Sequence, residues 1–420
     1  MMHSMLDRRD FLRLGLAGVS VAGTYPLFLG KTAAAARQDG DPDDDRILVV
    51  LQLSGGNDGL STVVPYADPA YGRARERLRV AEGDVLRIDG RVGLHPNWKD
   101  LKKVFDDGRM AIIQGVSYPN PTRSHFQAMD IWHAGDRDMV REGTGWLGRA
   151  VDSTCGNKPD PLLAVNLGKA VPRALIGKVS QPASFGGGGG FGARGKRDRD
   201  GDAGDDASPE MKASRPLGQI DFLQRVAIDG RRSAAVIQKA TQSYRPSADY
   251  PAGNRLAADL RAVAGLIAGK LPTRVYYVSL GGFDTHANQR GTHDNLMRVV
   301  STGVSAFLAD LSAQGLLDRV LVLAFSEFGR RVKENASGGT DHGVAAPMFL
   351  IGGKVAGGLH GEHPSLTELA GGDLAMKVDF RQVYATVLDG WLGIDSGKIL
   401  GAKRDPLPLL QGKRGRVRAF

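Results

Sequence analysis

The amino-acid sequence predicts an α/β fold in which a mostly parallel central sheet carries helices on both faces. Short, continuously apolar runs recur along the chain, and amphipathic segments with helical spacing precede several of them. The apolar runs do not alternate with polar residues, as is typical of strands that are covered on both faces. This repeated order of helix and buried strand predicts a three-layer sandwich.

Four runs rich in branched aliphatic residues are the predicted strands of the sheet. They are residues 47–53, 109–116, 275–280 and 319–325. The predicted helices show apolar residues on one face, and one of them closes on a glycine while another starts at an aspartate cap. They are residues 101–108, 255–271, 296–315 and 379–394.

Composition limits the class of protein. The 420 residues are 42% hydrophobic and 6% aromatic, which is enough for one large domain with a mainly aliphatic core. The net charge of +9 could favour an anionic substrate or an envelope surface, but no basic segment has the interleaved aromatic residues of a nucleic-acid site. The single cysteine, Cys155, permits no intramolecular disulfide, and we expect it to be a small buried hydrophobic residue.

The first 36 residues are expected to be a twin-arginine signal peptide. Arg8 and Arg9 precede a Phe-Leu pair and a glycine-rich apolar stretch, and an Ala-x-Ala sequence lies between residues 33 and 36. Pro26 and the many small residues favour a cleavable signal over a permanent anchor. We therefore expect a periplasmic or secreted protein that crosses by the twin-arginine translocase and keeps no stable membrane span.

The remaining chain is expected to form one domain, at residues 47–400, after an acidic linker at residues 37–46. Glycine and mixed charges at residues 185–215 predict a disordered surface insertion. A Gly-x-Gly-x-x-Gly match at residues 187–192 lacks the flanking strand and helix of a dinucleotide site. Residues 401–420 are expected to be a basic C-terminal tail.

Acidic residues and histidines follow the predicted strands. In a parallel sheet the carboxyl ends of the strands share one edge, where ligands bind. Carboxylates and imidazoles are ligands for zinc, manganese, calcium or magnesium, so we predict a divalent metal site at this edge. Each acid alone could instead cap a helix or form a turn. The candidate ligands are Asp58, Asp284, His286, Glu327, Asp341 and His342.

Ser124 is a candidate nucleophile in the loop after the second predicted strand. It would begin a helix, whose N-terminus stabilises anions, and Arg123 lies beside it. A serine beside divalent metals could attack a phosphorus or sulfur ester. Ser124 and Gln127 also match a capping box, which is a purely structural interpretation. Since no Gly-x-Ser-x-Gly elbow is present, an α/β-hydrolase mechanism is not expected.

Several stretches together resemble one family. They are "LVVLQLSGGNDGLSTVVPY", "LHPNW", "RSHFQAMDIW", "GWLGR", "GGFDTHANQ", "SEFGRR", "GTDHG" and "DFRQVYATVLDGWLG". With the twin-arginine start, they are similar to the domain-of-unknown-function 1501 family, exported proteins of the alkaline phosphatase and sulfatase superfamily. The resemblance covers about residues 47–394 and implies an alkaline-phosphatase-like fold.

The resemblance also implies a site with a nucleophile and two metal ions. Ser124 matches the nucleophile position, and the final histidine ligand would be His360 or His363. Glu327 has no secure counterpart and could be a ligand or a supporting base. The matched metal ligands are Asp58 at the early position, Asp284 and His286 for one ion, and Asp341 and His342 for the other.

The leading hypothesis is an exported metal-dependent hydrolase of phosphate or sulfate esters. Two divalent cations would hold the ester oxygens and lower the pKa of Ser124 or of a water molecule. Asn57 and Arg123 would help to neutralise an anionic small-molecule or polysaccharide ester. The alternative is a non-catalytic envelope binding protein with the same fold. A periplasmic redox enzyme is not expected, because the sequence lacks cofactor ligands.

Overall fold

The computed structural model describes residues 46–155, 160–185 and 233–412. The predicted signal peptide therefore lies outside the described residues. So do the acidic linker except Arg46, the insertion except Phe185, and the last eight residues of the tail. The organisation predicted for these segments stays a prediction.

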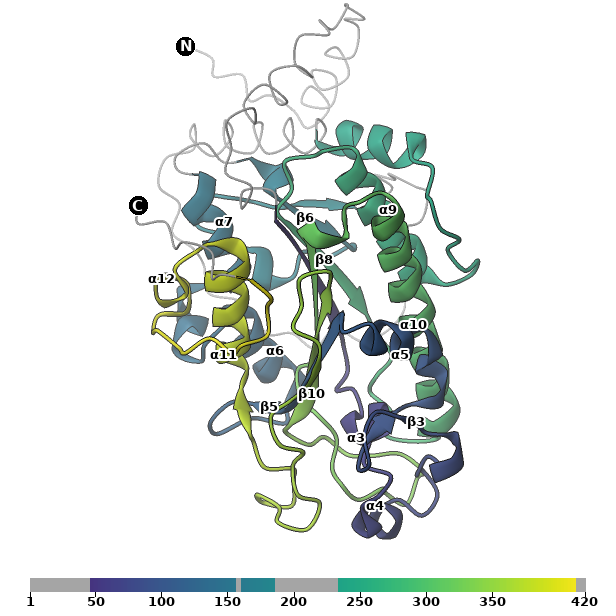
Figure 1. Cartoon of the computed structure of the whole chain (residues 1–420). Coiled ribbons are helices and arrows are strands. Elements are labelled where there is room, and N and C mark those ends of the chain that lie inside the picture. The colour runs from purple at the N-terminus through teal and green to yellow at the C-terminus, as the bar shows by residue number, and fades with distance from the viewer. Residues whose placement is uncertain (1–45, 156–159, 186–232, 413–420) are drawn as a thin grey trace, which may run out of the picture. The chain divides into compact units, whose positions relative to one another are not determined.

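A nine-stranded sheet runs through the centre of the described chain (Figure 1). Its strands are β1 (Ile47–Leu53), β5 (Met110–Ser117), β6 (Ala164–Leu167), β7 (Ala183–Phe185), β8 (Val275–Leu280), β9 (Val320–Phe325), β10 (Ala346–Gly352), β11 (Gly358–His360) and β12 (Val378–Asp379). The order is β11-β5-β10-β9-β1-β8-β6-β7, with β12 also paired to β5. All the neighbouring pairs are parallel except the two that involve β10, so the predicted mostly parallel sheet is confirmed.

Helices cover both faces of the sheet, as Figure 1 shows to its left and right. One face carries α5 (Lys99–Asp106), α9 (Arg255–Ala268) and α10 (Gln289–Ala313). The other carries α6 (His125–Ala134), α7 (Trp146–Cys155), α11 (Phe380–Ala385) and α12 (Ser396–Leu400), and a π-helix, η8 (Thr386–Leu392), follows α11. The predicted three-layer α/β sandwich is therefore confirmed.

The first strand shows how the sequence forms these layers. All seven residues of β1 are buried, and alternate side chains point to opposite faces of a strand. Val49 and Leu51 pack into the core beneath α9 and α10, whereas Leu48 and Val50 pack into the core beneath α6 and α11. Six of the seven residues are apolar because neither face of the strand meets water, and the exception, Gln52, accepts from Tyr277 Oη at 2.5 Å.

Smaller elements surround the sheet. The short helices α3 (Gly59–Thr62) and α4 (Pro69–Ala74) follow β1, and a second sheet has the order β2-β4-β3, formed by β2 (Val63–Val64), β3 (Leu86–Arg87) and β4 (Gly93–Leu94). Residues 233–243 are helical. Short 3-10 helices lie at Glu82–Asp84, Pro96–Trp98, Asp138–Glu142, Pro161–Leu163, Arg173–Leu175 and Leu317–Arg319.

Helix α10 is long and apolar enough to cross a membrane, and no other helix among the described residues meets that test. Yet 56% of its most apolar window is buried inside the protein. Met297, Val304 and Phe307 on this helix belong to the core beneath the sheet. In this structure α10 is therefore a core helix of the sandwich.

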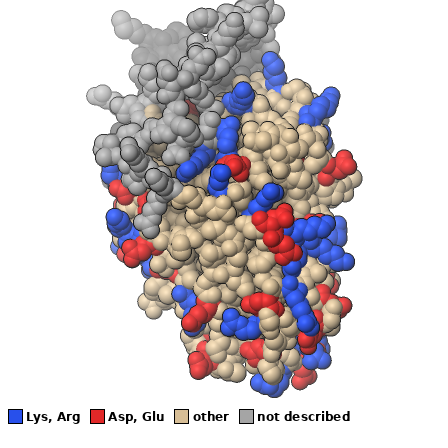
Figure 2. Space-filling view, in the orientation of Figure 1, with Lys and Arg blue, Asp and Glu red and all other residues tan. Residues whose placement is uncertain are grey.

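Charged side chains are interspersed on the face of the molecule that Figure 2 shows. Basic and acidic groups alternate there over the described residues instead of gathering into a patch of one sign. On this face the net positive charge therefore forms no broad anion-binding surface, and the recognition of an anion would have to come from local groups.

The strand directions bring distant loops to one edge of the sheet. β1, β8 and β9 are parallel, and β5 points the same way because both β5 and β9 are antiparallel to β10. The carboxyl ends of β1, β5, β8 and β9 therefore meet at one edge. The antiparallel β10 begins at that edge, so the loop that precedes β10 arrives there as well.

Cys155 differs from its prediction. The cysteine is only partly buried, and its Sγ lies 3.1 Å from Oγ of Ser180. It sits at the last residue of α7, where the chain leaves the packed face, so the thiol is not enclosed by the core.

Candidate metal centre

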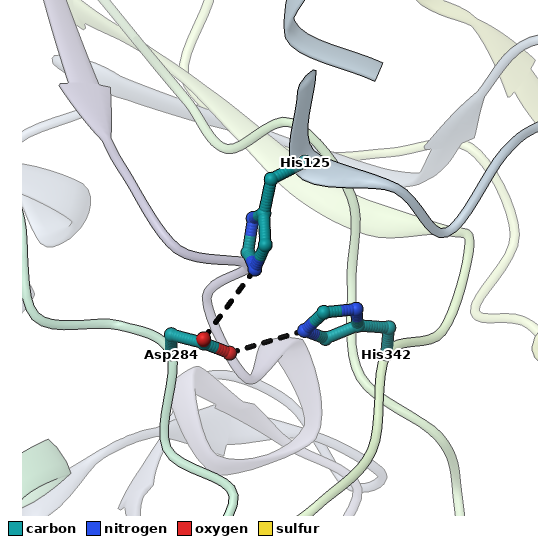
Figure 3. A group of neighbouring side chains, drawn as sticks. All are labelled: His125, Asp284 and His342. Carbon is teal, nitrogen blue, oxygen red and sulfur yellow. Dashed lines mark hydrogen bonds and ion pairs between the residues drawn. The ribbon is translucent and has the colours of Figure 1, made fainter. Parts of the chain in front are cut away.

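Three side chains from three segments converge at this edge of the sheet (Figure 3). His125 is the first residue of α6, Asp284 lies in the loop after β8, and His342 lies in the loop before β10. One ligand atom from each lies within 4.8 Å of the others. Asp284 Oδ1 is 3.1 Å from His342 Nε2, and Asp284 Oδ2 is 3.5 Å from His125 Nε2. We name these three residues the candidate metal centre.

The tautomer of His125 is fixed by a buried carboxylate. Nδ1 of His125 lies 2.8 Å from Oε1 of Glu327, so Nδ1 carries the proton and donates it. Nε2 then holds a lone pair that points toward Asp284 (Figure 3). This Nε2 atom is buried and has no hydrogen-bond partner among the described residues. A buried polar atom without a partner is costly, and a cation would satisfy it.

The tautomer of His342 is fixed in the same way by a backbone carbonyl. Its Nδ1 lies 2.8 Å from the carbonyl oxygen of Arg123, which can only accept a proton. Nε2 of His342 therefore presents a lone pair to the carboxylate of Asp284 in the neutral imidazole. Phe328 packs against the rings of His125 and His342, with centroid separations of 4.8 Å and 4.6 Å. Two imidazole lone pairs and a carboxylate that face one another form a donor set for a divalent cation.

Asp284 is kept ionised by its neighbours. The buried guanidinium of Arg330 donates to Oδ1 of Asp284 at 2.7 Å. Partial burial would raise the pKa of Asp284, but the hydrogen bond and the positive charge of Arg330 outweigh it and lower the pKa to about 2. Arg330 also donates to the backbone carbonyls of Gly56 and Thr340, at 2.7 Å and 2.8 Å. It thereby joins the loops around the centre.

Gly55 allows the loop after β1 to pack against the metal centre. Its backbone has a φ of 119°, and its N–H donates to Oε1 of Glu327 at 2.8 Å. A Cβ atom at this position would lie 2.5 Å from the backbone nitrogen of Asp284, closer than side chains approach backbone atoms. Glycine is therefore required for both the conformation and the close contact.

Two further predicted ligands lie at the rim of the centre. Nε2 of His286 is 2.9 Å from His342 Nε2 and 3.1 Å from Asp284 Oδ1, and its side chain is 44% exposed. Asp341 accepts from Asn335 at 3.1 Å and lies 3.5 Å from His286 Nδ1. The structure thus brings Asp284 and His342 together, although the sequence pattern had placed them on different ions.

Asp58 is not part of this group. Its fully buried carboxylate forms an ion pair with the equally buried Arg75 and accepts from Ser61 Oγ at 2.8 Å and from Gln289 Nε2 at 2.5 Å. It also accepts the N–H of Leu60 at 3.2 Å, as the cap of α3. Burial favours the neutral acid, but Arg75 outweighs it and holds the pKa of Asp58 well below its usual range.

Asn57 is also engaged inside the protein. Its Nδ2 lies 3.0 Å from Thr62 Oγ1, and its Oδ1 lies 3.1 Å from His293 Nε2. The side chain is buried and therefore has no exposed amide to offer to a substrate. The structure supports a structural role for Asn57 in place of substrate binding.

Ser124 begins α6 as expected, but it does not form the capping box. Its side chain makes no capping hydrogen bond, and Gln127 instead accepts from Thr122 Oγ1 at 3.0 Å. The hydroxyl of Ser124 has no hydrogen-bond partner within the described part of the chain, and the residue is partly exposed beside His125. The predicted capping box is therefore wrong, although Ser124 is the N-cap residue of α6.

The side chain of Arg123 is already neutralised. Its guanidinium forms an ion pair with the fully buried Asp373, with Nε 2.9 Å from Oδ2. The contribution of Arg123 to the centre is instead its backbone carbonyl, which orients His342.

The two candidates for the final histidine lie elsewhere. Nε2 of His360 lies 2.8 Å from the carbonyl of Ala356, and Nδ1 of His363 lies 2.9 Å from the carbonyl of Pro364. Neither belongs to the group of possible metal ligands found among the described residues. The second imidazole of the centre is His125, which the sequence interpretation missed. The sequence feature that could have indicated His125 is its position in "RSHFQ", after a predicted strand and next to Ser124.

Comparison with known proteins places the chain in a family. The model of the family described as "Protein of unknown function (DUF1501)" matches residues 112–417. The chain belongs to this family. The predicted family is thus confirmed, and the candidate metal centre of this DUF1501 protein lies wholly within the matched region. No curated protein matches the chain significantly.

Solved structures show only a weak similarity to this DUF1501 protein. Ps i-CgsB in complex with k-i-k-neocarrahexaose is 11% identical, with a TM-score of 0.36 over 86% of this chain and 73% of that chain. The periplasmic domain of EcEptC from Escherichia coli, in complex with Zn, is 10% identical, with a TM-score of 0.36 over 75% and 74%. The PsFucS1 sulfatase from Pseudoalteromonas sp. is 10% identical, with a TM-score of 0.35 over 94% and 78%.

Proposed function

We propose that this DUF1501 protein is a metal-dependent hydrolase of phosphate or sulfate esters that holds one divalent cation between His125, Asp284 and His342. The observation that carries the proposal is the unpartnered, buried Nε2 of His125, which faces the ionised carboxylate of Asp284. Both imidazoles have their Nδ1 protons bound elsewhere, so both direct lone pairs to the same place.

The donor set favours particular metals. Two imidazole nitrogens and one carboxylate suit zinc or manganese better than calcium or magnesium, which prefer oxygen ligands. Three protein ligands leave a coordination position open, as catalytic sites require. The exposed His286 lies at the rim, 2.9 Å from His342 Nε2, where it can contact the ion or the ester.

We propose one cation where the sequence led us to expect two. Asp58, the early ligand that the family resemblance implied, has a fully buried carboxylate that accepts from Arg75, Ser61, Gln289 and a backbone N–H. The guanidinium of Arg75 supplies the positive charge that a metal ion would otherwise bring. Among the described residues, Asp58 does not belong to the group of possible metal ligands.

The chain's own residues can supply the remaining chemistry. When bound, the cation would act as a Lewis acid on an ester oxygen. Ser124 Oγ has no hydrogen-bond partner among the described residues and lies one residue before His125, so it is placed to form a bond to phosphorus or sulfur. The bond to the alcohol oxygen would break, the alcohol would leave with the serine proton, and water would then release phosphate or sulfate from the serine. The free N–H groups at the start of α6 would stabilise the negative charge that develops there. Arg330 would hold Asp284 in place throughout.

Metal titration of the purified protein tests the proposal first. We expect one equivalent of zinc or manganese to bind to the wild type and to Asp249→Ala, a control at an exposed aspartate. Asp284→Ala should abolish binding. Two tightly bound ions would show that the single-ion proposal is wrong.

Ester turnover tests the proposal second. A panel of phosphate and sulfate mono- and diesters should include substrates that the metal-loaded wild type hydrolyses and that Asp284→Ala and Ser124→Ala do not. If the folded, metal-loaded protein is inert on the whole panel, the hydrolase proposal fails. The alternative, a non-catalytic envelope binding protein, would then stand, and the neutralisation of Arg123 by Asp373 favours it.

We also propose export by the twin-arginine pathway, on the sequence of the first 36 residues. The double variant Arg8→Lys, Arg9→Lys should leave the full-length precursor in the cytoplasm, while the wild type is cleaved and exported. Equal export of both proteins would contradict this proposal.

A further inference from the structure

A cavity of about 310 Å³ lies beside the candidate metal centre. Tyr118 and Pro121 line it from the loop between β5 and α6, Val344 lines it from the loop before β10, and Leu374 and Met376 line it from the loop before β12. A volume of this size accommodates a small organic group.

The cavity wall is continuous with both histidine-bearing segments. Arg123 lines the cavity and directly precedes Ser124. Its backbone carbonyl accepts a hydrogen bond from Nδ1 of His342 at 2.8 Å. Val344 follows His342 by two residues, and its carbonyl accepts a hydrogen bond from Ser117 at 3.4 Å. A group attached to an ester at the metal centre would therefore reach this cavity first.

The wall of the cavity is largely apolar. Tyr118 and Leu374 are buried, and Met376 stands at the mouth with 42% of its surface exposed. Burial of an apolar group against such side chains is favourable, whereas burial of a charge without a partner is costly.

The charged groups that line the cavity cancel one another. They are Arg123 and Asp373, which form an ion pair in which Asp373 is fully buried. Arg331 also approaches Asp373, at 3.9 Å, but does not line the cavity. The lining therefore offers no unpaired cation for a second anionic group on the substrate. Nη1 of Arg123 has no hydrogen-bond partner among the described residues, so one donor remains for a neutral acceptor.

We propose that this cavity binds the alcohol portion of the ester and selects an uncharged, ring-sized, apolar group over one that carries a further negative charge. The inference rests on the proposed function for its substrate class. It narrows that class from anionic esters in general, polysaccharides included, to esters of small uncharged alcohols.

Binding of an uncharged aryl alcohol tests the cavity without any turnover. We expect 2-naphthol to bind to the metal-loaded wild type, as measured by calorimetry. Met376→Trp should weaken this binding about tenfold by filling the mouth. Leu369→Trp is the matched control, because Leu369 is similarly exposed and does not line the cavity. No binding by the wild type, or equal binding by both variants, would overturn the inference.

Turnover tests the selectivity. Phenyl phosphate and 4-carboxyphenyl phosphate differ by one carboxylate group, which adds a negative charge, as do the two corresponding sulfates. The wild type should prefer the phenyl ester about tenfold in kcat/KM, and Asp373→Asn, which frees the charge of Arg123, should narrow the preference. Equal turnover of the two esters by the wild type would overturn the inference.

The two proposals fail in different ways. If esters are hydrolysed but Met376→Trp does not change naphthol binding, the hydrolase proposal stands and the role proposed for the cavity is wrong. If Met376→Trp weakens naphthol binding but no ester is hydrolysed, the cavity is a binding site for an apolar group and the hydrolase proposal is wrong.

Discussion

Nδ1 of His125 lies 2.8 Å from Oε1 of Glu327, a carboxylate whose side chain is only 1% exposed. The same oxygen accepts the N–H of Gly55 at 2.8 Å, and Oε2 lies 3.3 Å from Ser326 Oγ. Glu327, which the sequence suggested as a metal ligand, therefore has its oxygens engaged within the protein. Its role is to orient the histidine that faces the metal position.

Glu327→Gln should weaken metal binding while the ligand set stays complete. The amide keeps the shape of the side chain but loses the charge that fixes the proton on Nδ1 of His125. Loss of such a supporting carboxylate typically lowers metal affinity about 10–100-fold. Competition with a chromophoric chelator measures the effect, and Glu368→Gln, at an exposed glutamate, is the control. Unchanged zinc affinity in Glu327→Gln would refute the role assigned to this residue.

Gln289 should couple metal affinity to stability. Its buried Oε1 accepts from Thr285 Oγ1 at 3.1 Å and Thr340 Oγ1 at 2.6 Å, and its Nε2 donates to Asp58. These threonines flank the ligands in the two loops that carry Asp284 and His342. Gln289→Leu removes three buried hydrogen bonds, so we expect a loss of about 2–4 kcal/mol in the free energy of unfolding.

The measurement for Gln289→Leu is urea unfolding together with zinc competition. Zinc affinity should fall along with stability, because both ligand loops lose a common anchor. Gln242→Leu, at an exposed glutamine, should change neither quantity. A destabilised Gln289→Leu protein with wild-type zinc affinity would show that the contact supports the fold alone.

The sheet edge could be predicted from the sequence, because strand-end residues share an edge whenever the strands are parallel. Asp284 and His342 were found in this way. The distribution of the ligands over two ions followed the superfamily pattern, which assigned Asp284 and His286 to one ion and Asp341 and His342 to the other. In the structure β10 runs antiparallel to its neighbours, so the residues that precede it reach the same edge and bring His342 to Asp284.

Two of the predicted site residues are engaged within the protein for the same physical reason. Asp58 and Arg123 look like free charges in the sequence, yet each is neutralised by a distant partner, Arg75 or Asp373. Ion-pair partners far apart along the chain leave no local pattern. His125 was missed for the converse reason, since a lone histidine at a helix start has no spacing signal until Glu327 is seen to fix its tautomer.

Asp58→Asn should destabilise the protein without removing a metal ion. The variant leaves the guanidinium of Arg75 buried without its counter-charge, which costs about 3–5 kcal/mol at neutral pH. The folded pKa of Asp58 is lowered, so its stabilisation is complete above the ordinary value of 3.8 and is lost progressively as the pH falls below it.

Urea unfolding at several pH values, with metal analysis, checks this expectation for Asp58→Asn. The stability gap between the wild type and the variant should be constant from about pH 7 to pH 5 and should narrow toward about pH 3. Metal stoichiometry should stay at one in both proteins. A variant that binds one ion fewer than the wild type would make Asp58 a ligand after all.

Asp259→Asn should stabilise the protein at neutral pH. The side chain lies on α9 with 3% of its surface exposed, and its Oδ1 has no hydrogen-bond partner within the described residues. Burial raises the pKa of Asp259 to about 6, although Arg255, 3.9 Å away, opposes the rise. A raised pKa means that the folded state resists ionisation of Asp259. The free energy of unfolding therefore falls as the pH rises from the ordinary pKa of 3.8 to about 6, and above that pH the loss of stability is complete.

The neutral amide of Asp259→Asn removes this penalty but also loses the attraction of Arg255. We therefore expect a net gain of about 1 kcal/mol at pH values above about 7, and no gain near pH 3.5, where the aspartate is protonated in both states. Thermal unfolding of the two proteins across this range measures the difference. Asp249→Asn, at an exposed aspartate, should match the wild type throughout. A gain for Asp259→Asn that persists unchanged at low pH would mean that packing, and not the buried charge, sets the stability at this position.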